Sequence, residues 1–166
     1  MLFVIRRYHL LFPTWILIRH TLPFETILQQ EKIIVNRKKW DKELLNYISN
    51  KDKPVFLNGD LNVAHQPIDL KNPKSNYNKT SGYTQQEIDG MDNFISAGFT
   101  DTFRYFYPEK IKYSWWSYRF NSRSKNVGWR IDYFLASQDA IDMVKDSFIM
   151  NDVMGSDHCP VGIILK

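Results

Sequence analysis

An acidic residue and an amide residue stand two positions apart, directly after a short apolar run. In Asn58-Gly59-Asp60-Leu61-Asn62, Gly59 permits a sharp turn, and Asp60 and Asn62 can project to one side if the local chain stays extended. The carboxylate could deprotonate water or hold a hard cation, and the amide could bind a phosphate oxygen. An Asx-type turn favours the same residue types, so the motif alone leaves a structural role open.

A second polar motif, Ser156-Asp157-His158, stands just before the apolar segment 160–165. Aspartate oxygens are natural ligands for Mg²⁺, and a histidine can donate to a phosphate oxygen when a carboxylate holds its other ring nitrogen. These side chains can converge on one site where a strand begins. A polar loop without catalytic function is the alternative.

Asp132 lies within the largely apolar run 129–135. Burying a carboxylate is costly unless it is paired, so we expect a histidine or an arginine beside it. Pairing with His158 would raise the pKa of the histidine and fix its tautomer. A purely structural ion pair is the alternative.

Aromatic and basic side chains are interleaved between residues 113 and 130. The aromatic members include Trp115, Trp116, Tyr118, Phe120 and Trp129, and the basic members are Arg119, Arg123, Lys125 and Arg130. This mixture suits contact with a nucleic-acid backbone, with a base or sugar pressed against a ring. We therefore take Arg119, Arg123 and Arg130 as candidate DNA contacts, although a core strand with solvated arginines shows the same pattern.

These groups need a scaffold, and the apolar periodicity predicts alternating helices and strands. Residues 37–49 predict a helix, and the capping box Thr84-Gln85-Gln86-Glu87 begins another that Gly98 ends. Residues 72–81 form an expected loop. Strands are expected at 55–57, 113–118, 129–136, 148–151 and 161–165. The alternation indicates α/β layers, with the polar motifs where strands end.

Length and composition indicate a single globular domain. The chain has 166 residues, of which 43% are hydrophobic and 15% aromatic, and its net charge of +4 permits a polyanionic partner without requiring one. Cys159 is the single cysteine, which fits a reducing compartment, and we expect it to pack rather than react. The nearly apolar stretch 10–18 is shorter than the about 20 residues of a membrane span, and it lacks a signal-peptide cleavage site.

Three long motifs together resemble the exodeoxyribonuclease III and AP endonuclease family, with a lean toward its bacterial members. The first comprises Gly59-Asp60-Leu61-Asn62-Val63-Ala64-His65, Ile68-Asp69-Leu70 and Asn72-Pro73-Lys74; the second comprises Trp115-Trp116-Ser117-Tyr118-Arg119-Phe120 and Gly128-Trp129-Arg130-Ile131-Asp132-Tyr133; the third is Gly155-Ser156-Asp157-His158-Cys159-Pro160-Val161. The resemblance implies the endonuclease/exonuclease/phosphatase fold, a four-layered α/β sandwich with two packed sheets. It also implies Mg²⁺- or Mn²⁺-dependent hydrolysis of DNA phosphodiesters, by incision 5′ to abasic sites and removal of nucleotides from 3′ ends.

The resemblance also assigns roles by motif position. Asp60 would deprotonate the attacking water, and Asn62 would help to hold it. His158, oriented by Asp132, would donate to the scissile phosphate, and Asp157 would contribute to a metal site. The candidate metal ligands are therefore Asp157 together with Asp60, Asn62 and His158. The DNA contacts implied in this way are Asn76, in a loop one residue longer than is usual for the family, together with Trp129 and Trp115 against the extruded abasic sugar.

The resemblance covers residues 37–166, whereas residues 1–36 show none of the family's N-terminal motifs. We therefore expect residues 1–36 to be atypical and residues 37–166 to form the C-terminal part of the fold, without its N-terminal half. A truncated or frameshifted inactive fragment that retains at most DNA binding is the main alternative. A lipid- or inositol-phosphate phosphoesterase of the same superfamily is disfavoured by the Trp115 and Trp129 motifs. The expected partner is double-stranded DNA with abasic sites or 3′ ends. We expect the protein to act as a monomer in the bacterial cytoplasm and not at a membrane.

Overall fold

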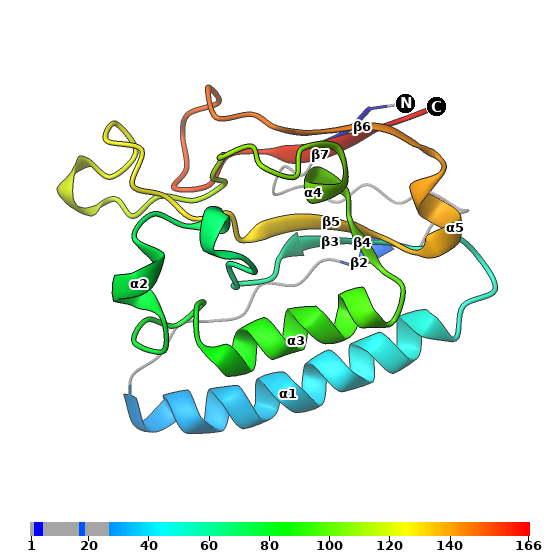
Figure 1. The fold of residues 1–166 in the computed structure, drawn as a ribbon, viewed down its shortest axis with the longest axis horizontal. Coiled ribbons are helices and arrows are strands. Elements are labelled where there is room, and N and C mark those ends of the chain that lie inside the picture. Colours follow the sequence, from blue (N-terminus) through cyan, green and yellow to red (C-terminus); the bar gives the residue numbers. More distant parts are fainter. Residues whose placement is uncertain (1, 5–16, 19–26) are drawn as a thin grey trace.

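The computed structural model describes residues 2–4, 17–18 and 27–166, with side chains from residue 37 onward. Two β-sheets pack against each other, and a helical layer covers the outer face of one of them (Figure 1). The four-stranded sheet has the order β2-β3-β5-β4, and the three-stranded sheet has the order β1-β7-β6. The predicted α/β class with two packed sheets is confirmed.

The helical layer consists of α1 (Ile27–Ser49) and α3 (Gln85–Ser96), which lie side by side (Figure 1). α1 begins well before the expected residue 37, and Leu44 and Ile48 on its inner face are buried as predicted. The capping box of α3 is confirmed, since Thr84 accepts from the Glu87 N–H and the Glu87 carboxylate accepts from the Thr84 N–H. None of the described helices has the length and apolarity needed to cross a bilayer.

The four-stranded sheet carries the acidic residues singled out above. It contains β2 (Leu17–Ile18), β3 (Phe56–Asp60), β4 (Thr100–Asp101) and β5 (Asp132–Ala136). Asp132 is therefore the first residue of β5 and not its middle, as the expected strand 129–136 implied. Alternation directs Leu57 and Leu135 toward the helices and Phe56 and Phe134 toward the other sheet.

The three-stranded sheet contains β1 (Leu2–Val4), β6 (Val144–Ile149) and β7 (Val161–Leu165). β7 matches its prediction, whereas β6 lies earlier than the expected strand 148–151. Cys159 packs just before β7 in the core between the sheets, where burial raises the pKa of its thiol to about 12. Its predicted packing role is confirmed.

The expected strand 113–118 is wrong. In this segment Trp115 alone forms bridges, one to Trp129 and one to His158, and the N–H groups of both Ser114 and Trp115 donate to the same Trp129 carbonyl. The segment lies between two partners and divides its hydrogen bonds, so no continuous ladder forms. The remaining helices are short: α2 (Pro73–Asn76), inside the expected loop 72–81, α4 (Thr102–Phe106) and α5 (Gln138–Ile141).

Candidate active site

Two carboxylates face each other at one end of the four-stranded sheet. The antiparallel register of β3 and β5 pairs Asp60 directly with Asp132. The pKa of Asp60 is raised to about 6, because burial disfavours its charge and the carboxylate of Asp132 repels it, while the Asn62 N–H and the charge of His158 act the other way. The position therefore holds more negative charge than its neighbours neutralise.

His158 joins these carboxylates from the segment that precedes β7. Its Nδ1 lies 2.9 Å from Asp132 Oδ2, and its Nε2 lies 3.9 Å from Asp60 Oδ2. Burial alone would lower the pKa of His158, but the hydrogen bond to Asp132 and the charges of Asp132, Asp60 and Asp157 outweigh it, so the pKa is raised. The expected Asp132–His158 pair is confirmed. It leaves Nε2 without a protein acceptor at hydrogen-bond distance among the described residues.

Asn62 lies in the turn that follows β3. Its backbone has a φ of 50°, and its N–H donates to Asp60 Oδ1 over 2.8 Å. The chain is therefore turned here and not extended, so the expectation that the two side chains project to one side of an extended segment is wrong. The Asx-type turn is present, and it orients the Asp60 carboxylate.

Asp157 and two indole rings form one wall next to this cluster. Trp115 Nε1 donates to Asp157 Oδ2 over 3.1 Å, and the rings of Trp115 and Trp129 meet edge to face with centroids 6.4 Å apart. Tyr83 also meets Trp129 edge to face, and Gly82 approaches Trp129 so closely that an added Cβ would lie 3.3 Å from the indole. Trp115 and Trp129 thus contact each other beside the cluster, and their contact with an abasic sugar stays a prediction.

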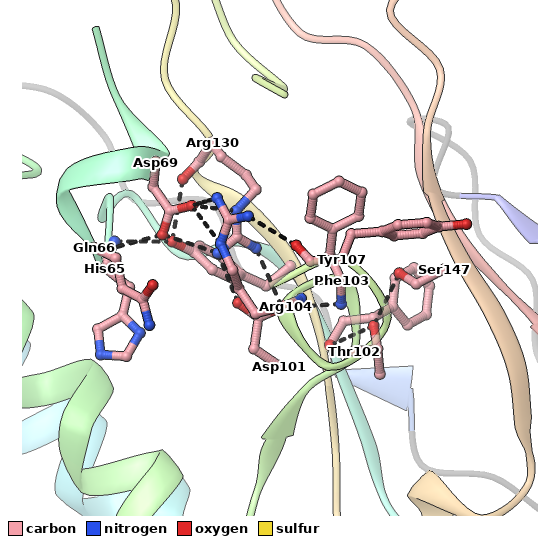
Figure 2. A network of polar contacts seen from close by, with 12 residues as sticks. His65, Gln66, Asp69, Asp101, Thr102, Phe103, Arg104, Tyr107, Arg130 and Ser147 are labelled. Atoms are coloured by element: carbon pink, nitrogen blue, oxygen red, sulfur yellow. Dashed lines mark hydrogen bonds and ion pairs between the residues drawn. The ribbon is translucent and has the colours of Figure 1, made fainter. Parts of the chain in front are cut away.

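Arg130 does not belong to a DNA-binding surface. Its side chain is 0% exposed and makes bidentate contacts to both Asp69 and Asp101, while Arg104 adds a further ion pair to Asp69 (Figure 2). The predicted DNA contact of Arg130 is wrong, because a fully buried guanidinium held by two carboxylates cannot reach a phosphate. Sequence reasoning missed this network. The argument applied to Asp132, that an acid among apolar residues needs a partner, could have been applied to Asp69 in Ile68-Asp69-Leu70.

The other predicted DNA contacts differ in how free they are. Asn76 uses its amide within its own loop, donating to the Asn72 carbonyl and accepting from Thr80 Oγ1. Arg123 donates to the carbonyls of Asn151, Val153 and Ser156. Arg119 is exposed, and within the described part of the chain no acceptor contacts its guanidinium. Of these three residues, Arg119 is placed best for a phosphate.

The described residues include ligand types that suit a divalent cation, but too few of them come together in one place to form a complete site. Carboxylate and amide oxygens such as those of Asp60 and Asn62 suit Mg²⁺. However, no group of three or more His, Cys, Asp or Glu side chains arranged to hold a metal ion occurs within the described ranges. The predicted set of Asp60, Asn62, Asp157 and His158 is thus not assembled as a complete metal site.

Comparison with known proteins identifies the family to which the chain belongs. The model of the endonuclease/exonuclease/phosphatase family matches residues 14–158. The chain is 53% identical over 133 residues to an exodeoxyribonuclease of Bacillus subtilis, covering 78% of this chain and 52% of the relative. It is 51% identical over 132 residues to the DNA repair nuclease APEX1 of Danio rerio, covering 78% and 42%. The chain thus spans about half the length of these relatives.

Solved structures show the same fold. An AP endonuclease of Leishmania major matches with a TM-score of 0.73 at 31% identity, and the match covers 81% of this chain and 45% of the Leishmania chain. An AP endonuclease of Archaeoglobus fulgidus has a TM-score of 0.79 at 23% identity and covers 90% and 60%. The layers described here are therefore part of the fold that these nucleases have.

Proposed function

Because the chain belongs to the endonuclease/exonuclease/phosphatase family, we propose that it is the His158-bearing part of a DNA-repair phosphodiesterase of the exodeoxyribonuclease III type. The proposed activities are incision at abasic sites and 3′–5′ exonuclease action. The observation that carries the proposal is the meeting of Asp60, Asp132 and His158 at one end of the sheet. Relatives named exodeoxyribonuclease and DNA repair nuclease support the choice of DNA over other phosphoesters.

The geometry supports a division of roles between acid and base. His158, held through Nδ1 by Asp132 and with a raised pKa, can donate from Nε2 to an oxygen of the scissile phosphate. Asp60, with a pKa of about 6, is ionised at neutral pH and basic enough to accept a proton from an attacking water. In phosphoryl transfer the protein contributes mainly positioning and charge stabilisation, and these residues can provide both.

We propose that DNA lies along the loops at this end of the molecule. Tyr118 and Phe120 are 76% and 84% exposed on either side of Arg119, so a cation and two apolar rings face solvent together. Trp115 and Trp129 would contact an abasic sugar turned out of the helix, and an abasic nucleotide is less costly to turn out because it has no base to unstack. Asp60 and Asn62 would hold a Mg²⁺ or Mn²⁺ ion, which would supply positive charge to the phosphate when bound.

An inactive polypeptide that retains at most DNA binding is the second candidate. The absence of a three-ligand metal cluster from the described residues favours it over a fully active enzyme. This candidate predicts retention of DNA that weakens with salt, without strand cleavage. Monomeric action in a bacterial cytoplasm stays a prediction of the family resemblance.

A nicking assay separates the two candidates. The full chain would be incubated with a duplex that contains one abasic site, with Mg²⁺ and with EDTA, beside the Asp60→Asn and His158→Gln variants. Cleavage that EDTA abolishes and both substitutions remove supports the phosphodiesterase. Retention of the duplex without incision at any metal concentration would support the binding remnant and overturn the enzyme proposal.

A further inference from the structure

Two loops that are distant in sequence meet through one arginine. Arg123 lies in the basic loop 117–126, and its guanidinium reaches residues 150–158, here called the His158 loop. Nη1 donates to the Ser156 carbonyl over 2.8 Å, and Nη2 donates to the carbonyls of Asn151 and Val153 over 2.9 and 2.6 Å. One planar fork therefore joins both ends of a six-residue turn.

The ends of the His158 loop are held by bonds from the Asn151 side chain to the Tyr113 carbonyl and from the Trp116 N–H to the Asp157 carbonyl, whereas its tip is sparsely packed. Met154 at its tip is 71% exposed, and Gly155, with a φ of 106°, has no atom within 4 Å of the position that a Cβ would occupy. An exposed turn with so few apolar contacts is expected to open locally unless polar contacts hold it. The three bonds from Arg123 are such contacts, and hydrogen bonds from a charged donor are among the stronger kind.

Arg123 is itself held in place from behind. Its guanidinium lies 4.6 Å from the centroid of the Trp116 ring, and that ring is only 3% exposed. Trp116 Nε1 donates to Asn126 Oδ1, and Gly128 packs so tightly against the indole that an added Cβ would lie 2.4 Å from Nε1. The arginine thus connects the loop to a buried and tightly packed ring.

The connection continues from the loop to the reacting groups. Ser156, whose carbonyl Arg123 binds, accepts the His158 N–H on its Oγ over 3.2 Å and donates from the same Oγ to Asp157 Oδ1. A displacement of Ser156 would therefore disturb both Asp157 and His158. The His158 ring must stay within hydrogen-bond reach of Asp132 in order to act.

We propose that Arg123 is a positioning residue that holds the His158 loop, and through Ser156 the Asp157–His158 pair, against the Trp116 ring. The inference rests on the proposed function only in so far as His158 is one of its reacting groups. It replaces the expectation that Arg123 binds a phosphate. Arg119 provides the matched comparison, since it lies four positions earlier in the same loop, and no acceptor in the described chain contacts its guanidinium.

The first test needs no activity. Amide hydrogen exchange would be followed in the full-length chain for Val153 and His158, whose N–H groups bond to the Met150 carbonyl and to Ser156 Oγ. Arg123→Lys keeps the charge but has no planar fork, so exchange at both amides should accelerate by about 10-fold, the factor for losing one hydrogen bond from a charged donor. Arg119→Lys should leave both amides unchanged. Equal exchange in the two variants would overturn the proposal.

The second test uses cleavage of the abasic duplex and separates kcat from KM. Arg123→Lys should lower kcat by about 10-fold, the loss typical of groups that orient reacting residues, and leave the salt dependence of KM as it was. Arg119→Ala should raise KM and reduce the slope of log affinity against log salt by about 0.9. If Arg123→Lys keeps full kcat while Arg123→Ala behaves like Arg119→Ala, Arg123 is a phosphate contact and the proposal fails. If the unmodified chain does not cleave at all, the proposed function fails, and the exchange experiment still decides the role of Arg123.

Discussion

Two clusters of charged side chains lie in the same layer of the molecule and are built on opposite principles. Around Asp69, Asp101, Arg104 and Arg130, two carboxylates meet two guanidinium groups, and the side chains are at most 9% exposed (Figure 2). At the candidate active site, two carboxylates share one imidazole, and the His158 side chain is 31% exposed. The first cluster is neutral and closed, whereas the second has an excess of negative charge and is open to solvent.

The difference shows in two aspartates of the same chain. Burial by itself raises the pKa of Asp69, but the charges and hydrogen bonds of Arg130 and Arg104 outweigh it, so the pKa of Asp69 is lowered. Burial likewise raises the pKa of Asp60, and Asp132 raises it further, to about 6. Where charge is balanced internally the cluster stabilises the fold, and where it is unbalanced it is available to a proton, a cation or a substrate.

Removing a member of the closed cluster should have the largest effect on stability. Arg130→Met leaves Asp69 and Asp101 buried with too few cationic partners, so we expect the free energy of unfolding to fall by about 3–5 kcal/mol. Urea unfolding measures this loss, with Arg119→Met as the matched substitution of an exposed arginine. A loss no larger than that of Arg119→Met would contradict the structural role assigned to the network.

The same substitution at the two aspartates should act with opposite signs. Asp60→Asn removes a carboxylate whose folded pKa of about 6 exceeds its ordinary 3.8, so above pH 6 the variant should be more stable by about 1 kcal/mol. Asp69→Asn should destabilise above pH 4, because the folded pKa of Asp69 is lowered and its charge is favourable. Asp60→Asn should also reduce cleavage by at least about 100-fold as a lost general base. Unfolding curves with the same sign for both variants would remove the contrast between the clusters.

The pH dependence of kcat/KM should come from the open cluster alone. The acid limb should fall near pH 6, where Asp60 takes up a proton, and the alkaline limb should lie above pH 6.5, since the pKa of His158 is raised. The stabilising contribution of His158 is complete below its unfolded pKa and is lost as pH rises through its folded pKa. His158→Gln should therefore remove the alkaline limb from any residual rate. The ordinary pKa of histidine is about 6.5. A profile that is flat between about pH 5 and 8, the range around this pKa, would contradict these assignments.

Cation binding should also distinguish the two clusters, and we expect its effect to be the smallest of the four described here. Added Mg²⁺ should lower the apparent pKa of Asp60, because a cation favours the carboxylate over the acid, and it should leave Asp69 unchanged because Arg104 and Arg130 already neutralise it. Carboxyl-carbon NMR titrations with Mg²⁺ and after addition of EDTA would measure both residues. An equal response of both carboxyl groups would show that the open cluster has no preference for the ion.

Several structural features were predicted correctly from the sequence. The capping box at Thr84 and Glu87 depends on contacts over a few positions, and it is present. The strand at 161–165 is also present, although it pairs with the distant strands β1 and β6. The pairing of Asp132 with His158 was also expected, since a carboxylate at the edge of the core needs a partner and the motif before β7 contains one.

Other assignments depended on which distant segment meets a side chain. Arg130 and Arg123 stand in the same aromatic and basic stretch as Arg119, and the pattern of residues does not separate them. Arg130 is buried because it pairs with Asp69 and Asp101, which lie 61 and 29 positions away along the chain. Arg123 is hydrogen-bonded because the His158 loop folds against it. By itself the sequence determined the family, the local elements and the chemistry available at the strand ends. The tertiary structure alone decided which arginines are neutralised, because an arginine facing solvent and one facing a buried carboxylate have the same local sequence pattern, and they differ only in the long-range contacts that replace water.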